Sequence, residues 1–217
     1  MDFSQLWDAG GAAIVFGGTL LATVLTCGMD EIRVALGATM ALLVRPFSFA
    51  KARAEIARDV ENMRRDGVLR AHPLASSDRE IALVSDALVH DRSLRSALAT
   101  HEALQDKRAR MREKALSPVR QAAEMAPVFG MAGTLFGLSQ MRLGEGDNSQ
   151  MLASMSTAIL TTLYGIILAN LVFHPLARLL ERRMLAEEAD RQRLIDWLAA
   201  QLAASCPPSR SHLDKTG

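Results

Sequence analysis

The stretch MLASMSTAILTTLYGIILANLVFHPL, residues 151–176, contains no Asp, Glu, Lys or Arg, and His174 is its one ionisable imidazole. An α-helix rises about 1.5 Å per residue, so roughly 20 apolar residues cross the ~30 Å hydrocarbon core of a bilayer. The many small residues and few aromatics are typical of helices that pack closely in lipid. We therefore predict that residues 151–176 form a transmembrane helix.

Two further apolar blocks predict two more spans. The first, AGGAAIVFGGTLLATVLTCG at residues 9–28, has no charge, and the other covers residues 122–142. A secretory signal peptide is the alternative for the first block, but that needs a basic region, and residues 1–8 contain no Lys or Arg. The apolar run at 34–44 is too short to span, so it continues the first helix or lies at the membrane interface.

The segments between and after these blocks are charged. Residues 29–121 form a predicted helical loop, and the part from 45 to 120 holds sixteen Lys and Arg and eleven Asp and Glu residues. Apolar residues recur there at helical spacing, and Ser77 or Asp78 could cap a helix with Glu80 in its first turn. The apolar residues at that spacing are Ile56, Val60, Met63, Ile81, Val84 and Leu88. Residues 177–217 predict a charged helix to about residue 204 and then a disordered tail.

The placement of Lys and Arg predicts the topology. Residues 1–8 lack basic residues, and the polar turn at 143–150 is too short to join anything but antiparallel neighbours. Nearly all basic residues lie in the loop and the tail, which we place in the cytoplasm, with the N-terminus and the turn in the periplasm. The predicted fold class is all-α: an integral membrane protein with three transmembrane helices and a helical cytoplasmic insertion.

Overall composition excludes several classes of function. The net charge of +1 implies no nucleic acid partner. Cys27 and Cys206 form neither a metal-ligand cluster nor a plausible disulfide framework, and no phosphate-binding, metalloprotease or hydrolase motif occurs. We expect no enzyme activity, no cofactor and no metal.

Small residues form a stripe on each of the last two predicted spans. Such stripes let helix backbones approach closely in lipid. Structural packing is one interpretation, and the lining of a functional interface is the other. The residues concerned are Gly130, Gly133, Gly137, Ala158, Gly165 and Ala169.

Three threonines on these stripes are candidates for lining an ion pathway. Thr134, Thr161 and Thr162 place hydroxyls at membrane depth, where a hydroxyl needs a partner. A hydrogen bond to the helix's own i−4 carbonyl is one explanation, and a polar strip for ions or water is the other. No Asp, Glu, Lys or Arg lies deep in any predicted span, so a titrating carboxylate must come from another polypeptide.

Four residues near the cytoplasmic ends of these spans have two interpretations each. Pro127 and Pro175 are either tolerated at helix ends or form a pair of hinges at one membrane level. Glu124 and His174 either tune ion exit or anchor the helices at the interface.

Several motifs resemble the MotA/TolQ/ExbB proton-channel family, most closely its MotA/PomA flagellar-stator branch. APVFGMAGTLFGL (126–138), STAILTTLYGIILANLVFHPLARLL (156–180), IVFGGTLLATVL (14–25) and RRDGVL (64–69) carry the resemblance. The stator branch has four spans, and the first predicted span here matches its second, so we expect its first to be lacking. The acidic rotor-facing position of the loop is occupied by His72.

The resemblance implies a pentamer in the bacterial inner membrane around a single-span MotB-like partner, whose intramembrane Asp carries the ion. It implies that Thr134 and Thr162, with Thr161 beside them, line the pore, and that Pro127 and Pro175 couple ion flow to movement. Arg64 and Arg65 would face the flagellar rotor protein. The alternatives are a TolQ/ExbB-like energiser with a TolR/ExbD-like partner, or a non-conducting membrane scaffold. The sequence decides neither the coupling ion nor the machine that is driven.

Overall fold

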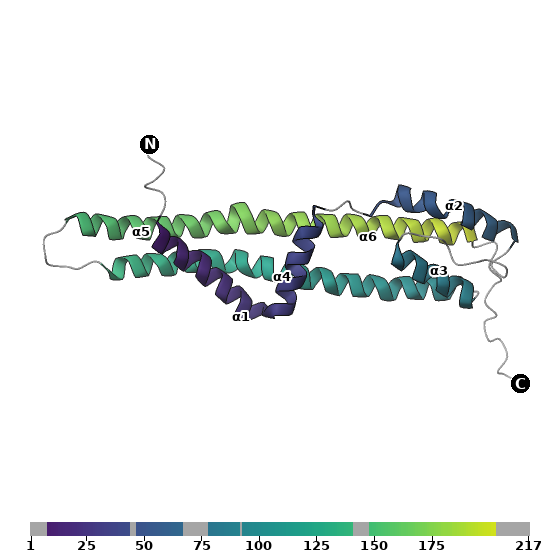
Figure 1. Ribbon diagram of the computed structural model, residues 1–217, viewed down its shortest axis with the longest axis horizontal. Helices are drawn as coiled ribbons and strands as arrows, with labels where there is room; N and C mark the ends of the chain where they lie inside the picture. The colour runs from purple at the N-terminus through teal and green to yellow at the C-terminus, as the bar shows by residue number, and fades with distance from the viewer. Residues whose placement is uncertain (1–7, 44–46, 67–77, 92, 141–147, 203–217) are drawn as a thin grey trace, which may run out of the picture. The chain divides into compact units, whose positions relative to one another are not determined.

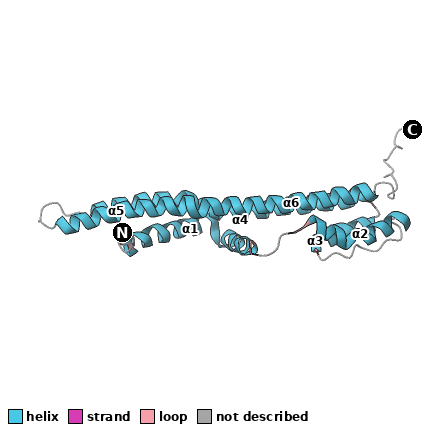
Figure 2. Cartoon of the chain, turned by 90° about the horizontal axis from the view of Figure 1, so that it is seen from above, coloured by secondary structure: helices cyan, strands magenta, loops and turns pink. Residues whose placement is uncertain are grey.

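The computed structural model describes residues 8–43, 47–66, 78–91, 93–140 and 148–202, and every regular element among them is helical (Figures 1 and 2). The all-α prediction is therefore confirmed. The chain divides into two compact units, residues 1–44 with 111–182 and residues 45–110 with 183–217. The elements are α1 Ala9–Ala41, α2 Phe49–Asp66, α3 Arg79–Asp91, α4 Leu94–Ser139, α5 Asn148–Ile167, the π-helical turn η3 Leu168–Phe173, and α6 His174–Leu202.

The helices run past the boundaries that hydropathy indicated. Residues 122–139 of the predicted span at 122–142 are the C-terminal part of the 46-residue helix α4, and residues 141 and 142 lie outside the described part of the chain. The predicted span at 151–176 takes in most of α5, all of η3 and the start of α6, which form one continuous ribbon in Figure 2. A change from apolar to charged side chains does not end a helix when Ala, Leu, Arg, Glu and Gln, all good helix formers, continue the chain.

Within the described residues, two helical stretches are long and apolar enough to cross a membrane: Ala9–Ala41 and Met151–Leu202. The C-terminal part of α4 is not among them. Glu124 and Pro127 lie in this part, together with small and weakly polar residues that lower its hydropathy. The third predicted span therefore has less support from hydropathy than the other two.

Helix α1 bends sharply at Gly28 (Figure 1). This residue has φ 79° and ψ 163°, a combination that only glycine adopts without strain. Gly28 is also the last residue of the predicted first span, and the charged residues Asp30, Glu31 and Arg33 follow it. The apolar run beginning at residue 34 continues the helix as a second arm of α1.

The unit of residues 45–110 and 183–217 is a helical bundle with its own apolar core. The helical spacing seen in the sequence accounts for its central residues, since Ile56 and Leu88 are fully buried and Val60, Ile81 and Val84 nearly so. Of the two capping candidates, Ser77 lies outside the described residues and Asp78 caps α3, because its Oδ1 accepts from the backbone N–H of Glu80 at 2.9 Å. The core also includes Ala52, Ala97, Leu194, Ile195, Leu198 and Leu202.

A half-buried ionic cluster joins the helices of this bundle. The Arg108 guanidinium lies 2.6 Å from a Glu188 carboxylate oxygen and also pairs with Glu80. Arg191 binds Asp78 through two hydrogen bonds of 2.8 and 3.1 Å. The hydrogen bond from Arg108 lowers the pKa of Glu188 against the opposing effect of burial. Burial alone would raise the pKa of Asp78, but the bonds and charge of Arg191 lower it.

Candidate ion-conducting helix interface

Glycines let α4 and α5 approach backbone to backbone in the unit of residues 1–44 and 111–182. A Cβ atom built on Gly165 would lie 2.6 Å from the Ala126 carbonyl oxygen and 3.0 Å from Gly130 Cα. A Cβ atom on Gly130 would lie 3.0 Å from the Thr161 carbonyl oxygen. These separations leave no room for a side chain, so Gly130 and Gly165 fix the closest approach of the two helices.

The other small residues of the predicted stripes extend this contact in both directions. A Cβ atom on Gly137 would lie 3.2 Å from the Ala158 backbone nitrogen. At the other end, Ala169 is buried with Ala126 in an apolar cluster that Val15 of α1 completes. The structure thus brings all six residues of the two stripes to one interface.

Thr161 is enclosed where three helices meet. Its side chain is 0% exposed. A Cβ atom on Gly133 of α4 would lie 2.7 Å from Thr161 Cβ, and one on Gly11 of α1 would lie 2.7 Å from Thr161 Cγ2. The Thr161 hydroxyl donates to the Ala158 carbonyl at 2.9 Å. This arrangement fits a packing residue that holds α1, α4 and α5 together.

Thr134 and Thr162 are less enclosed. Both are half-buried, and their hydroxyls also donate to carbonyls of their own helices, Thr134 to Met131 at 2.6 Å and Thr162 to Ala158 at 3.5 Å. The hydrogen bond to the i−4 carbonyl that the sequence offered as one explanation is present at Thr162, whereas Thr134 and Thr161 bond the i−3 carbonyl of their own helices. Each of these bonds uses the hydroxyl proton and leaves the oxygen lone pairs, which are what a cation or water would contact.

Asp8 also lies beside this interface, although the sequence did not predict it as a site residue. It caps α1, with Oδ1 accepting from the Gly10 backbone N–H at 3.0 Å, and its own backbone N–H donates to the Tyr164 hydroxyl at 3.0 Å. Its Oδ2 atom is buried and has no hydrogen-bond partner among the described residues. Oδ2 would lie 2.9 Å from a Cβ atom on Gly11, the residue that also faces Thr161. The sequence signal was the capping position directly before an apolar run.

The two prolines lie in different local structures. Pro127 lies inside α4, together with Pro118, which the sequence reading did not single out. Pro175 follows the π-helical turn η3, and at the end of that turn the His174 backbone N–H bonds to the Ala169 carbonyl. A proline has no N–H and its ring clashes with the i−4 carbonyl, so a widened turn before Pro175 accommodates it within a continuous helix.

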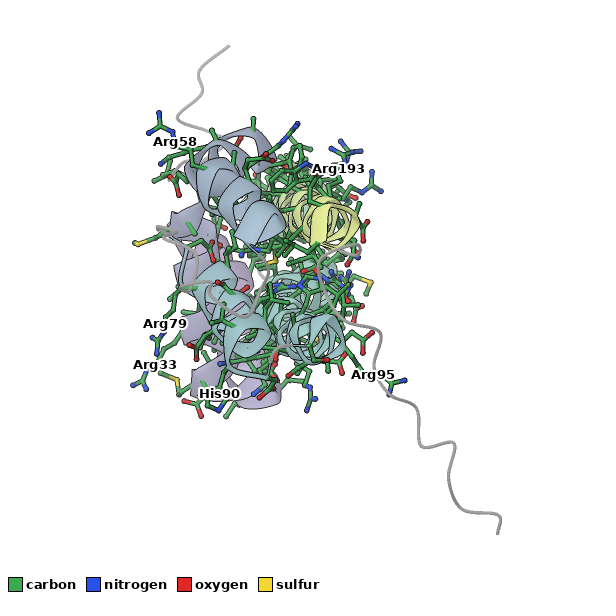
Figure 3. All side chains as sticks on the ribbon, turned by 90° about the vertical axis from the view of Figure 1, so that its right-hand side faces the viewer. Arg33, Arg58, Arg79, His90, Arg95 and Arg193 are labelled. Carbon is green, nitrogen blue, oxygen red and sulfur yellow. The ribbon has the colours of Figure 1, made fainter. Side chains whose placement is uncertain are left out.

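The remaining predicted site residues are scattered. Glu124 and His174 are both exposed. Arg64 and Arg65 lie in the last turn of α2, and their side chains are outside the described residues, as are His72 and Cys206. Basic residues elsewhere in that bundle, among them Arg58, Arg79 and Arg193, point outward in Figure 3. Among the described residues no group of three His, Cys, Asp or Glu side chains could hold a metal ion.

Comparison with known proteins shows which family and which proteins this chain is similar to. Residues 77–193 match the family model of the MotA/TolQ/ExbB proton channel family. The chemotaxis protein PomA of Vibrio alginolyticus is 32% identical over 201 residues, covering 89% of this chain and 77% of PomA.

Two solved structures share the fold. The flagellar MotAB stator complex from Bacillus subtilis superposes with a TM-score of 0.70 at 21% identity, over 93% of this chain and 81% of that one. MotAB from C. jejuni superposes with a TM-score of 0.75 at 18% identity, over 96% of this chain and 86% of that one.

Proposed function

The chain belongs to the MotA/TolQ/ExbB proton channel family, and from this premise we propose that it is the ion-channel-forming subunit of a MotA-type stator. In this proposal the coupling ion is a proton, and its flow drives rotation of the flagellar motor. The protein crosses the bacterial inner membrane three times, through the first part of α1, the C-terminal part of α4, and α5 with η3. The N-terminus is periplasmic and the C-terminus cytoplasmic.

The glycine-mediated contact between α4 and α5 is the observation that carries this proposal. It encloses Thr161 completely and leaves Thr134 and Thr162 half-buried. We therefore divide the three threonines by role. Thr134 and Thr162 line the ion pathway with hydroxyl oxygens, and Thr161 holds the helices in the geometry that places them there.

A partner chain supplies the titrating group in this proposal. Residues 125–141 and 149–173 contain no Asp, Glu, Lys or Arg, so they offer polar lining but no ion carrier. A single-span MotB-like protein with an intramembrane Asp fits this requirement, and PomA and the two MotAB structures are similar to this chain. Asp8, at the periplasmic end of α1, places a carboxylate of this chain beside the interface.

Exposed apolar residues support assembly of several copies. Leu135, Leu152, Ile159 and Leu171 are each between 67% and 70% exposed in the single chain. Those facing lipid need no partner, but a subunit of a channel must also pack against its neighbours, for which we propose a pentamer. Pro127 and Pro175, the latter with its π-helical turn, are the proposed points at which ion flow moves the cytoplasmic bundle. Arg64 and Arg65 are the proposed rotor-docking residues.

Co-expression with a single-span partner tests the proposal. We would reconstitute this chain with the product of an adjacent gene that encodes one span with an Asp near its start, and measure proton flux into vesicles. Flux should require both chains and disappear when the partner's Asp is replaced by Asn. Absence of flux with the partner bound would indicate a scaffold, and stable pairing only with a TolR/ExbD-like protein would indicate an energiser of another envelope process.

A further inference from the structure

We propose that the cavity at the bend of α1 binds one acyl chain of a phospholipid. The two arms of α1 meet at Gly28, and between them lies a cavity of about 400 Å³. Its size falls within the range of small-molecule sites in proteins, about 300–1,000 Å³. This inference takes from the proposed function only that the first arm of α1 spans the membrane.

The wall of the cavity suits a hydrocarbon chain. Fifteen residues line it, none of them charged. Thr23 and Thr39 bond their hydroxyls to the carbonyls of Thr19 and Ala35 at 2.7 and 2.8 Å, so these two threonine hydroxyls are satisfied within α1 itself. Thr19, the third threonine of the wall, has a buried hydroxyl with no hydrogen-bond partner among the described residues. The wall draws on both arms of α1, on α4 through Val119 and on η3 through Phe173. Burial of apolar surface is therefore the main source of affinity that this site offers.

The edge of the cavity is continuous with surface that faces lipid. Phe16, Leu20 and Leu36 line it and are 51%, 69% and 59% exposed, so an acyl chain could enter from the bilayer without first crossing a polar rim. The same exposure argues against a water-soluble ligand, because such a ligand would have to reach this opening through hydrocarbon.

One basic side chain, Arg33, lies at the bend beside two acidic ones, Asp30 and Glu31, and it is the group that favours a lipid with a phosphate over a lipid without one. Arg33 follows the pocket-lining Ile32, and its side chain is 76% exposed and points outward in Figure 3. Asp30 lies 3.9 Å from it and is almost fully exposed, so this pair is weak. A guanidinium at the end of a span is well placed to bind a lipid phosphate with charge-assisted hydrogen bonds.

Photo-crosslinking with matched variants tests the site. The full chain, in vesicles with its partner, is irradiated with a phosphatidylglycerol that carries a diazirine in one acyl chain, and labelled peptides are mapped. Val24→Phe fills the cavity, whereas Leu25→Phe adds a ring at the neighbouring position, which is 76% exposed and does not line it. Labelling of the peptides that line the cavity should fall about tenfold in V24F and stay unchanged in L25F.

A second pair of variants, in the second arm of α1, keeps the test valid if Val24→Phe misfolds. Thr39→Phe fills the cavity from the second arm, and Met40→Phe, at an exposed neighbouring position outside it, is its control. Arg33→Gln should reduce labelling by phosphatidylglycerol but leave labelling by a diazirine-bearing diacylglycerol unchanged.

Three outcomes overturn the proposal: equal labelling in V24F and L25F, labelling confined to peptides outside the cavity, or a photoreactive residue at position 24 capturing a second copy of the chain. Proton flux measured on the same vesicles keeps the two proposals apart. Specific labelling without any flux defeats the ion-channel proposal alone, and flux without specific labelling defeats the lipid site alone.

Discussion

Gly165→Ala should separate α4 from α5 and destabilise the protein. The added Cβ atom would lie 2.6 Å from the Ala126 carbonyl oxygen and 3.0 Å from Gly130 Cα, which are backbone atoms that cannot rotate away. An ordinary C···O contact is about 3.3 Å, so the helices must move apart by about 0.7 Å. A gap of that size forfeits about a quarter to a half of the dispersion energy of the atoms that line it.

Two effects of opposite sign determine how much Gly165→Ala changes the free energy of unfolding. Overpacking costs about 1–3 kcal/mol, and a clash with backbone atoms that cannot move aside lies in the upper part of that range, about 2–3 kcal/mol. Replacing glycine by alanine within a helix gains about 1 kcal/mol. The net loss is about 1–2 kcal/mol. For a chain of this length each kcal/mol lowers Tm by about 2–4 °C, so we expect a fall of about 2–8 °C.

Thermal melting of the full chain in nanodiscs measures this effect, with Gly17→Ala as the matched control. No heavy atom lies within 4 Å of a Cβ atom on Gly17, so G17A gains helix propensity without a clash and should melt at or above the wild-type temperature. Gly130→Ala, with its nearest contact at 3.0 Å, should fall between the two. A G165A protein that melts as high as the wild type would refute the close-contact argument, as would equal losses in G165A and G17A.

Further predictions concern the bend and the cytoplasmic bundle. The added Cβ atom of Gly28→Ala meets no atom within 4 Å, but alanine is strained at φ 79°, so this variant should lower the free energy of unfolding by about 1–3 kcal/mol. It should also straighten α1, which a longer distance between spin labels on its two arms would show. Arg108→Gln should cost about 1.5–3 kcal/mol in chemical unfolding, because Glu80 and Glu188 lose a charged hydrogen-bond donor, whereas the exposed Arg95→Gln should change stability little. The lowered pKa values of Asp78 and Glu188 stabilise the bundle fully above their ordinary values of 3.8 and 4.5. This stabilisation should be lost as pH falls through the lowered pKa values that the two carboxyls have in the folded protein. Acid unfolding followed by circular dichroism measures the loss. An unchanged acid midpoint in Asp78→Asn would contradict the assignment.

Periodicity and capping could be read directly from the sequence. Burial of Ile56, Val60, Ile81, Val84 and Leu88 in one core follows from their helical spacing, and the cap at Asp78 from its position before Glu80. Both depend on residues near one another in sequence, so single-chain patterns were sufficient to predict them.

Features that depend on contacts between distant segments could not be predicted in the same way. The three threonines look alike in sequence, yet only Thr161 is enclosed, because Gly11 and Gly133 from two other helices close around it. The buried Oδ2 atom of Asp8 likewise depends on α1 meeting α5. Hydropathy also placed helix ends at changes of composition, whereas α4 and α6 continue through them because charged residues with high helix propensity follow.

Proton flux into vesicles that contain this chain and its partner, compared between Thr162→Val and Thr161→Val, tests the division of roles most directly. Valine matches the shape of threonine but removes the hydroxyl oxygen. We predict that T162V lowers flux about tenfold, as expected for the loss of about 1.4 kcal/mol of polar contact with the ion. T161V should leave flux near the wild-type level, because this side chain is fully enclosed between helices and valine keeps its shape. Flux unchanged in T162V, or lost in T161V alone, would contradict the account.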